Sequence, residues 1–214
     1  MIDTIIFDNE GVIADTEPAW DKEQEIFLGR RGIKYNKERT KHLLSGKSIP
    51  DGVRILKKEY NLTGDEIAMS EERYAIIKKL LETDVYFVEG FMDFYRLVKL
   101  KYKTCIATSM DEDLLKILDR QLKLSELFRG SIYTLKQVQN KSKPCPDIFL
   151  YAANKLNSRP GNCIVIEDSP NGIEAAINAG MKCIGLATTY TGEKLKNADL
   201  IVKSFDEIDL NRLG

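Results

Sequence analysis

Short apolar runs alternate with helix-period segments along most of this chain. Apolar, β-rich runs occur at 4–7, 103–107, 131–134, 162–166 and 182–186, with a further candidate at 199–203. Apolar residues at helical spacing fill 91–101 and 147–157, and 169–180 reads as a capped, alanine-rich helix. Strands that alternate with helices predict an α/β fold with a doubly wound, mostly parallel sheet.

Residues 15–85 interrupt this pattern. They hold long charged amphipathic stretches at 18–31, 37–43, 51–59 and 65–82, and no run there reads as a strand. We therefore expect a small all-helical cap domain at 15–85, inserted after the first strand and lying over its end as a lid. The core would then consist of residues 1–14 and 86–214.

Charge and hydropathy exclude several classes of partner. The 214 residues include 32 basic and 33 acidic side chains, a net charge of -1, which favours neither nucleic acid nor an anionic membrane. No apolar run approaches the roughly 18 residues of a membrane span, and the first residues do not resemble a secretion signal. We expect a cytoplasmic monomer with no nucleic-acid or membrane partner.

Two rare residue types narrow the chemistry further. The four cysteines have no C-x-x-C spacing, and we expect them to be reduced. His42 is the single histidine, which argues against a histidine-rich zinc site and against a nucleophile triad that uses histidine. Any catalysis must depend on carboxylates, lysines and hydroxyls.

Such residues follow the ends of the predicted strands. Asp8 and Glu10 follow 4–7, and Thr108 follows 103–107. Each could have a simpler explanation, as a turn residue or a helix cap. Because parallel strands bring their carboxyl ends to one edge of a sheet, their joint occurrence is more informative than any one of them.

Two further groups complete the pattern. Lys143 lies in a loop stiffened by two prolines, and the adjacent acids Glu167 and Asp168 follow 162–166. Taken singly, the lysine could be solvated and the acids could cap a helix. Acids gathered this closely repel one another unless a cation lies among them, and an all-oxygen ligand set favours Mg²⁺.

These motifs resemble those of the haloacid dehalogenase (HAD) superfamily, in the branch with a helical cap that includes β-phosphoglucomutases and small phosphatases. The four motifs occur in order as Asp8-x-Glu10-Gly-Val, Ile106-Ala-Thr108-Ser109, Lys143-Pro-x-Pro-Asp and Ile166-Glu167-Asp168-Ser-x-x-Gly172. The resemblance covers essentially the whole chain and implies a HAD-type Rossmann-like core.

The resemblance also implies a role for each acid. Asp8 would attack the phosphoryl group and become an aspartyl phosphate, which water then hydrolyses. Mg²⁺ would be held by the carboxylates of Asp8 and Asp168 and by the backbone carbonyl of Glu10, with Glu167 just beyond these ligands.

The same resemblance assigns the phosphate seat. Thr108 and the backbone amides of Ser109 and Met110 would hold the phosphoryl oxygens, and Lys143 would offset their charge and that of Asp8.

Glu10 departs from the family pattern, since most of its phosphatases and mutases carry Asp at that position. A glutamate keeps a carboxyl group, so general acid and then general base catalysis remain available. Enolase-phosphatases of the superfamily also carry Asp-x-Glu-Gly. We expect a Mg²⁺-dependent phosphatase that hydrolyses a small, sugar-phosphate-like metabolite, with Glu10 as its acid and base.

Three other functions stay open. A phosphomutase of the β-phosphoglucomutase type is one, although its cap histidine and Gly-x-Ser-Arg loop correspond here to Trp20 and to Gly46-Lys47-Ser48-Ile49. A catalytically weak phosphate-binding relative is the second. A response-regulator receiver is the third and fits less well, because its acidic pair precedes the phosphorylated aspartate. Candidates for the substrate side of the cap are Thr16, Glu17, Trp20, Gly46, Lys47 and Ser48.

Overall fold

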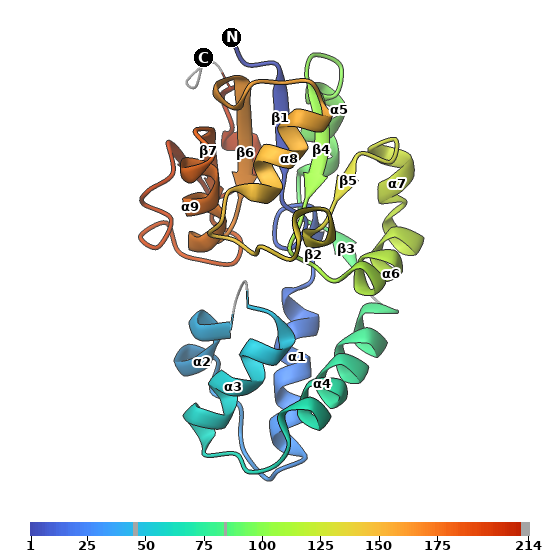
Figure 1. Cartoon of the computed structure of the whole chain (residues 1–214), viewed down its shortest axis with the longest axis vertical. Helices are drawn as coiled ribbons and strands as arrows, with labels where there is room; N and C mark the ends of the chain where they lie inside the picture. The colour runs from blue at the N-terminus through green and yellow to red at the C-terminus, as the bar shows by residue number, and fades with distance from the viewer. Residues whose placement is uncertain (45–46, 84, 211–214) are drawn as a thin grey trace. The chain divides into compact units, whose positions relative to one another are not determined.

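The computed structural model describes residues 1–44, 47–83 and 85–210 (Figure 1). The chain divides into two compact units, one formed by Met1–Asp15 with Val85–Gly214 and the other by Thr16–Asp84. Each unit has a hydrophobic core of its own.

The first unit is built on a six-stranded parallel sheet. Its strand order is β5-β4-β1-β6-β7-β8, so β1 lies between β4 and β6. The strands are β1 (Thr4–Phe7), β4 (Lys103–Ala107), β5 (Ile132–Tyr133), β6 (Cys163–Glu167), β7 (Lys182–Leu186) and β8 (Leu200–Val202). The sequence prediction of a doubly wound α/β fold is confirmed, with every predicted run present as a strand.

Helices cover both faces of this sheet because successive strand residues point to opposite sides. Ile6 packs in one hydrophobic cluster with residues of α8 (Asp147–Lys155) and α9 (Pro170–Asn178). These two helices cover the face of the sheet that is turned to the viewer in Figure 1. Phe7 makes edge-to-face ring contacts with Phe91 and Phe94 of α5 (Phe91–Val98). The remaining elements are α6 (Glu112–Leu122), α7 (Leu124–Leu127) and the 3-10 turns Leu135–Val138, Pro160–Asn162 and Phe205–Glu207.

The described residues of the second unit form four helices. They are α1 (Glu17–Gly29), α2 (Lys37–Leu44), α3 (Ile49–Tyr60) and α4 (Glu66–Leu81), each close to a predicted amphipathic stretch. Ser48 and Asp65 accept hydrogen bonds from the first turns of α3 and α4, which fixes where those helices begin. The hydrophobic core of this unit includes Phe27 of α1, Leu56 of α3 and Ile76 of α4.

Two features of the fold have no counterpart in the sequence prediction. β2 (Ala14–Asp15) pairs antiparallel with β3 (Tyr86–Phe87), where the chain leaves and re-enters the first unit. Strands of two residues are too short to show a period-2 pattern. The helices α6 and α7 were also not individually predicted.

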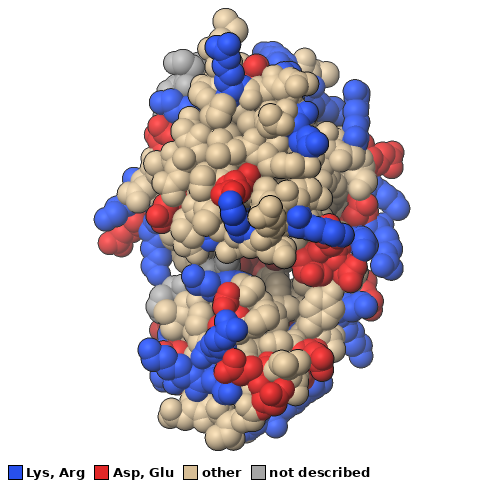
Figure 2. Space-filling model, viewed as in Figure 1, with Lys and Arg blue, Asp and Glu red and all other residues tan. Residues whose placement is uncertain are grey.

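The surface agrees with the balanced composition. Charges of both signs are interspersed over the visible face of the molecule (Figure 2). Across the described residues, none of the helices combines the length and the apolar character that crossing a membrane requires.

Candidate active site

The fold brings the ends of three neighbouring strands together. Phe7, the last residue of β1, is paired with Ile106 of β4 on one side and with Ile166 of β6 on the other. Asp8 and Thr108 therefore follow adjacent strands, and both are almost completely buried. The sequence placed these groups at one edge of the sheet, and the register of the strands puts them side by side.

Lys143 joins two of the acids. Its ammonium donates to Asp8 Oδ1 at 2.6 Å and to Glu167 Oε1 at 2.7 Å, and it lies 4.9 Å from the centroid of the Phe149 ring. The residue is 8% exposed although it belongs to a loop. A lysine so enclosed, with its charge used on two carboxylates, is held in one orientation and is not the solvated side chain that loop lysines usually are.

Glu167 has contacts at both carboxylate oxygens. Oε1 accepts from Lys143, while Oε2 accepts from the backbone amides of Asp168 and Ser169 and from the Ser169 hydroxyl, each at 2.9 Å. Gly172 makes room for this group, because a Cβ at that position would fall 1.8 Å from Glu167 Oε1. The Glu167 carboxylate therefore holds both the Lys143 ammonium and the residues that begin α9 in fixed positions.

Burial and the neighbouring charges shift the pKa values of Asp8 and Lys143 in opposite directions. Burial raises the pKa of the Asp8 carboxyl to about 6, against the lowering effect of Lys143. Burial alone would lower the pKa of Lys143, but Asp8 and Glu167 together raise it above the ordinary value, so its ammonium stays protonated.

The three acids form a compact oxygen cluster that fits a divalent cation. One ligand atom each from Asp8, Glu167 and Asp168 lie within 4.8 Å of one another, and all three residues are buried. Gly11, with a φ of +71°, lets the chain pass so close to Asp168 that a Cβ would meet Oδ2 at 2.0 Å. Because Lys143 brings one positive charge to three carboxylates, an additional cation with a preference for oxygen suits this cluster.

The loop after β4 differs in detail from its sequence prediction. The resemblance assigned the backbone amides of Ser109 and Met110 to the phosphoryl oxygens, but the Met110 amide donates to Thr108 Oγ1 at 3.0 Å. The cap of α6 is Asp111, whose carboxylate accepts from the Asp113 amide, so Thr108 is not a helix cap. The Ser109 hydroxyl is buried with no hydrogen-bond partner in this structure.

Glu10 lies in the tight turn that follows Asp8. Its side chain is partly exposed, and its backbone forms a bridge with Ala14. The Asn9 carbonyl accepts from the amides of Ile13 and Ala14, and the Gly11 amide donates to the Ala14 carbonyl. These bonds fix the backbone of the turn, including the peptide group of Glu10.

Three further polar residues of the site were missed by sequence reasoning. Asn9 is fully buried, and its amide donates to Met110 Sδ at 3.7 Å. Thr188, after β7, donates to the Gly11 carbonyl at 2.6 Å, and the buried Thr189 hydroxyl lies against the same glycine. A pair of threonines after an apolar run is too common to be noticed, and Asn9 beside two acids reads as a turn residue.

The cap candidates all belong to the helical unit. Glu17 forms an ion pair with Lys41, Thr16 precedes α1, and Trp20 is half-buried. The Ser48 hydroxyl bonds with Asp51 at the start of α3, and Lys47 is exposed. Gly46 lies outside the described residues. A role for these residues in binding substrate stays a prediction.

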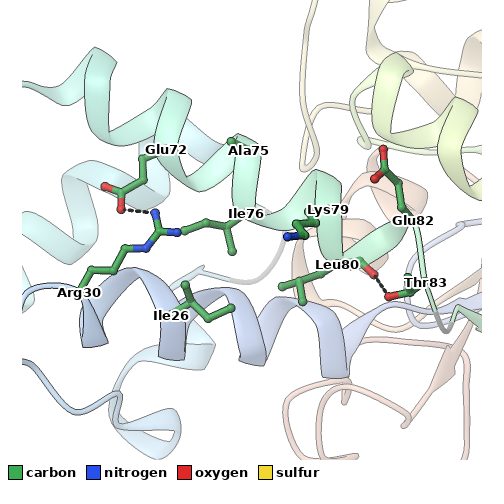
Figure 3. A pocket seen from close by; sticks show the side chains of 9 residues that line it. All are labelled: Ile26, Arg30, Glu72, Ala75, Ile76, Lys79, Leu80, Glu82 and Thr83. Atoms are coloured by element: carbon green, nitrogen blue, oxygen red, sulfur yellow. Dashed lines mark hydrogen bonds and ion pairs between the residues drawn. The ribbon is translucent and has the colours of Figure 1, made fainter.

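The helical unit also has a cavity of about 510 Å³ between α1 and α4 (Figure 3). Its floor is apolar and its rim carries the ion pair of Arg30 with Glu72. All of its lining residues lie between 26 and 83, so it includes none of the acids at the sheet edge. The lining residues are Ile26, Arg30, Glu72, Ala75, Ile76, Lys79, Leu80, Glu82 and Thr83.

Two known proteins with similar sequences over most of this chain are phosphatases by name. A Drosophila melanogaster protein named "Probable pseudouridine-5'-phosphatase" is 30% identical over 98% of this chain and 92% of its own length. The (DL)-glycerol-3-phosphatase 2 of Arabidopsis thaliana is 31% identical over 84% of this chain and 77% of its own length.

Two solved structures superpose on nearly the whole of this chain. The HAD hydrolase, family IA, variant 3 of Entamoeba histolytica superposes with a TM-score of 0.83 at 26% identity, covering 99% of this chain and 97% of that one. The β-phosphoglucomutase of Clostridium difficile superposes with a TM-score of 0.78 at 26% identity, covering 99% and 95%. The family model for haloacid dehalogenase-like hydrolases matches residues 5–186, and the chain belongs to that family of enzymes.

Proposed function

We propose that this enzyme is a Mg²⁺-dependent phosphatase that hydrolyses a small phosphorylated metabolite through a phosphoryl group carried on Asp8. The observation that carries the proposal is the buried contact of Lys143 with both Asp8 and Glu167, directly beside Asp168. This arrangement couples a nucleophilic carboxylate to a fixed cation, which phosphoryl transfer requires.

In the first step, an oxygen of the Asp8 carboxylate attacks phosphorus, and the bond from phosphorus to the alcohol oxygen breaks. Glu10 gives its proton to the departing alcohol. Lys143 and the Thr108 hydroxyl stabilise the charge on the transferring group. In the second step, Glu10 takes a proton from water as the water oxygen attacks phosphorus, which releases phosphate and restores the Asp8 carboxylate.

The carboxylates of Asp8 and Asp168 and the Glu10 carbonyl would hold Mg²⁺. Glu167 fits beside these ligands and not among them, because both of its oxygens already have donors. When bound, the ion screens the repulsion between Asp8 and the phosphate dianion.

The class of substrate follows from the family and its named members. Two relatives that match most of this chain are named as a glycerol-3-phosphatase and as a phosphatase of phosphorylated carbohydrates. We propose a phosphate monoester of a small polyol, sugar or nucleoside.

A panel of such monoesters tests this proposal, with release of inorganic phosphate as the readout. We expect release only with Mg²⁺ present and its loss on chelation. Asp8→Asn keeps the shape of the side chain and should lower turnover by at least about 10³. Residual activity of Asp8→Asn within tenfold of the wild type would remove Asp8 from its role.

A phosphomutase is the second candidate, favoured by the likeness to the Clostridium difficile enzyme and by 41% identity over 73 residues to the β-phosphoglucomutase of Bacillus subtilis. Incubation with β-glucose 1-phosphate and a bisphosphate primer separates the two functions. A mutase gives the 6-phosphate, whereas a phosphatase gives free phosphate.

A further inference from the structure

Two consecutive threonines after β7 contact the turn that carries Glu10 and Gly11. The Thr188 hydroxyl donates to the Gly11 carbonyl at 2.6 Å, which fixes the loop against the turn. Thr189, the next residue, also approaches this glycine. A Cβ on Gly11 would lie 2.6 Å from Thr189 Oγ1 and 2.0 Å from Asp168 Oδ2, so both oxygens approach one face of Gly11.

The Thr189 hydroxyl is buried and has no hydrogen-bond partner in this structure. A buried hydroxyl without a partner destabilises a fold, and most such groups are satisfied by protein atoms or by ordered water. Asp168 Oδ2 approaches the same glycine, yet the hydroxyl does not bond to it. The described protein atoms leave the Thr189 hydroxyl unsatisfied, so a water molecule or a ligand atom is left to bond with it.

A hydrated divalent cation would supply such a water molecule. Mg²⁺ seldom gives up all of its water, so an ion held by Asp8 and Asp168 brings water molecules to the neighbourhood of these carboxylates. A threonine hydroxyl can both accept from and donate to such a water. Partners of this kind, outside the direct ligands, commonly change metal affinity by about 10- to 100-fold.

We propose that the Thr189 hydroxyl binds a water molecule of the hydrated Mg²⁺ ion and thereby sets the affinity of the site for the metal. The inference rests on the metal site of the proposed function. It makes Thr189 a positioning residue, since it acts on the ion through water and does not touch the reacting atoms.

The test measures metal binding in the absence of substrate. Free Mn²⁺, an oxygen-preferring substitute for Mg²⁺, is counted by electron paramagnetic resonance in titrations of the full chain, and Mg²⁺ is then added as competitor. Thr189→Val removes the hydroxyl at nearly constant volume, and Thr189→Ser keeps it. Thr191→Val is the matched control, because Thr191 is exposed in the same loop.

We expect Thr189→Val to weaken metal binding about tenfold or more, and Thr189→Ser and Thr191→Val to stay within about threefold of the wild type. Without metal, Thr189→Val should melt at or above the wild-type temperature, because an unsatisfied hydroxyl has been removed. Thr189→Ala should weaken metal binding in the same way.

Wild-type metal affinity in Thr189→Val would overturn the inference. So would a metal-free Thr189→Val protein that melts well below the wild type, because the hydroxyl would then serve the fold itself. If the wild-type protein binds neither Mn²⁺ nor Mg²⁺, the proposed metal site fails, and with it the proposed function. The titrations therefore distinguish an error about Thr189 from an error about the metal site of the proposed function.

Discussion

Lys143 and Asp8 are separated by 135 positions in the sequence, yet the Lys143 ammonium donates to Asp8 Oδ1 at 2.6 Å. The same ammonium contacts Glu167, so a loop residue links the end of β1 to the end of β6. Because all three groups are buried, the loss of the cation leaves two carboxylates close together without a counter-charge.

Lys143→Met should therefore lower turnover by at least about 10³ and also lower the melting temperature of the protein. Lys141→Met is the matched control, since Lys141 is exposed two positions earlier and pairs with Asp147 at the surface. Phosphate release and thermal melting are measured on both variants. If Lys143→Met retained more than a tenth of wild-type turnover, Lys143 would not stabilise the transferring phosphoryl group.

Gly172→Ala tests whether turnover depends on the position of the Glu167 carboxylate, which holds Lys143. The added Cβ would fall 1.8 Å from Glu167 Oε1 and 2.4 Å from Oε2, so the carboxylate must leave the position in which it accepts from Lys143. We expect a fall in turnover of about a hundredfold, the scale of a displacement of about 1 Å at a site.

Gly161→Ala is the matched control for this substitution, because no atom lies within 4 Å of its added Cβ. It should keep wild-type turnover and stability. Equal activity of Gly172→Ala and Gly161→Ala would show that the position of Glu167 is not critical.

Much of the sheet and of its edge could be predicted from the sequence, because strands and carboxylates at their ends leave local signals. The parallel character of the sheet then follows from alternating strands and helices, whereas the strand order, with β1 between β4 and β6, was not predicted. The contacts of Asn9 and Thr189 could not be predicted. They depend on loops from distant strands meeting at Gly11 and Met110, and no local pattern records such a meeting.

The buried ion pair of the helical unit was missed for a related reason. Glu23 and Arg73 lie on α1 and α4 and read as ordinary charges of exposed helix faces, yet they are 0% and 3% exposed. Arg73 donates to both carboxylate oxygens, at 2.9 and 2.8 Å. An amphipathic pattern predicts that the charged residues of a helix face solvent, so a charged pair buried between two helices is recognised only in the structure.

Glu23→Gln should destabilise the helical unit by about 3–5 kcal/mol, because it leaves the Arg73 charge buried with a neutral partner. Glu25→Gln, which breaks the exposed pair with Lys22, should cost less than about 1 kcal/mol. Urea unfolding of both variants measures the difference. The double variant Glu23→Gln with Arg73→Leu should recover part of the loss, and no recovery would argue against a buried unpaired charge as the cause.

The pKa of Asp8 gives a pH dependence with a definite sign. Burial raises this pKa from 3.8 to about 6, so the folded protein holds the proton more tightly than the unfolded chain does. The stability that the group contributes is therefore present below about pH 4 and is lost as the pH rises through about 6 in the absence of metal. Mg²⁺ needs the ionised carboxylate, so its affinity should increase over the same window.

Asp8→Asn isolates this effect from the other titrating acids. The gap in melting temperature between the metal-free wild type and Asp8→Asn should favour the wild type more at about pH 4.5 than at about pH 7. A gap that stays constant between these two conditions would mean that the Asp8 carboxyl does not titrate there.

Glu10 carries the sharpest prediction, because its side chain and its backbone are assigned different roles. Glu10→Gln should lower turnover by about 10² to 10⁴, the usual range for an acid or base, and leave Mn²⁺ affinity nearly unchanged. The loss should be smaller for an aryl phosphate in the first step, since that leaving group departs without protonation. Glu89→Gln, at an exposed position of the same unit, should behave as the wild type.

Two outcomes would change the assignment of Glu10. Loss of metal binding in Glu10→Gln would make the side chain a direct ligand of the ion, in place of the backbone carbonyl. A large gain of activity in Glu10→Asp would mean that the extra methylene of Glu10 holds the carboxyl out of line with the leaving oxygen. In that case the natural protein is a slow catalyst, and tight binding of a phosphorylated ligand with little turnover becomes the function that the site supports.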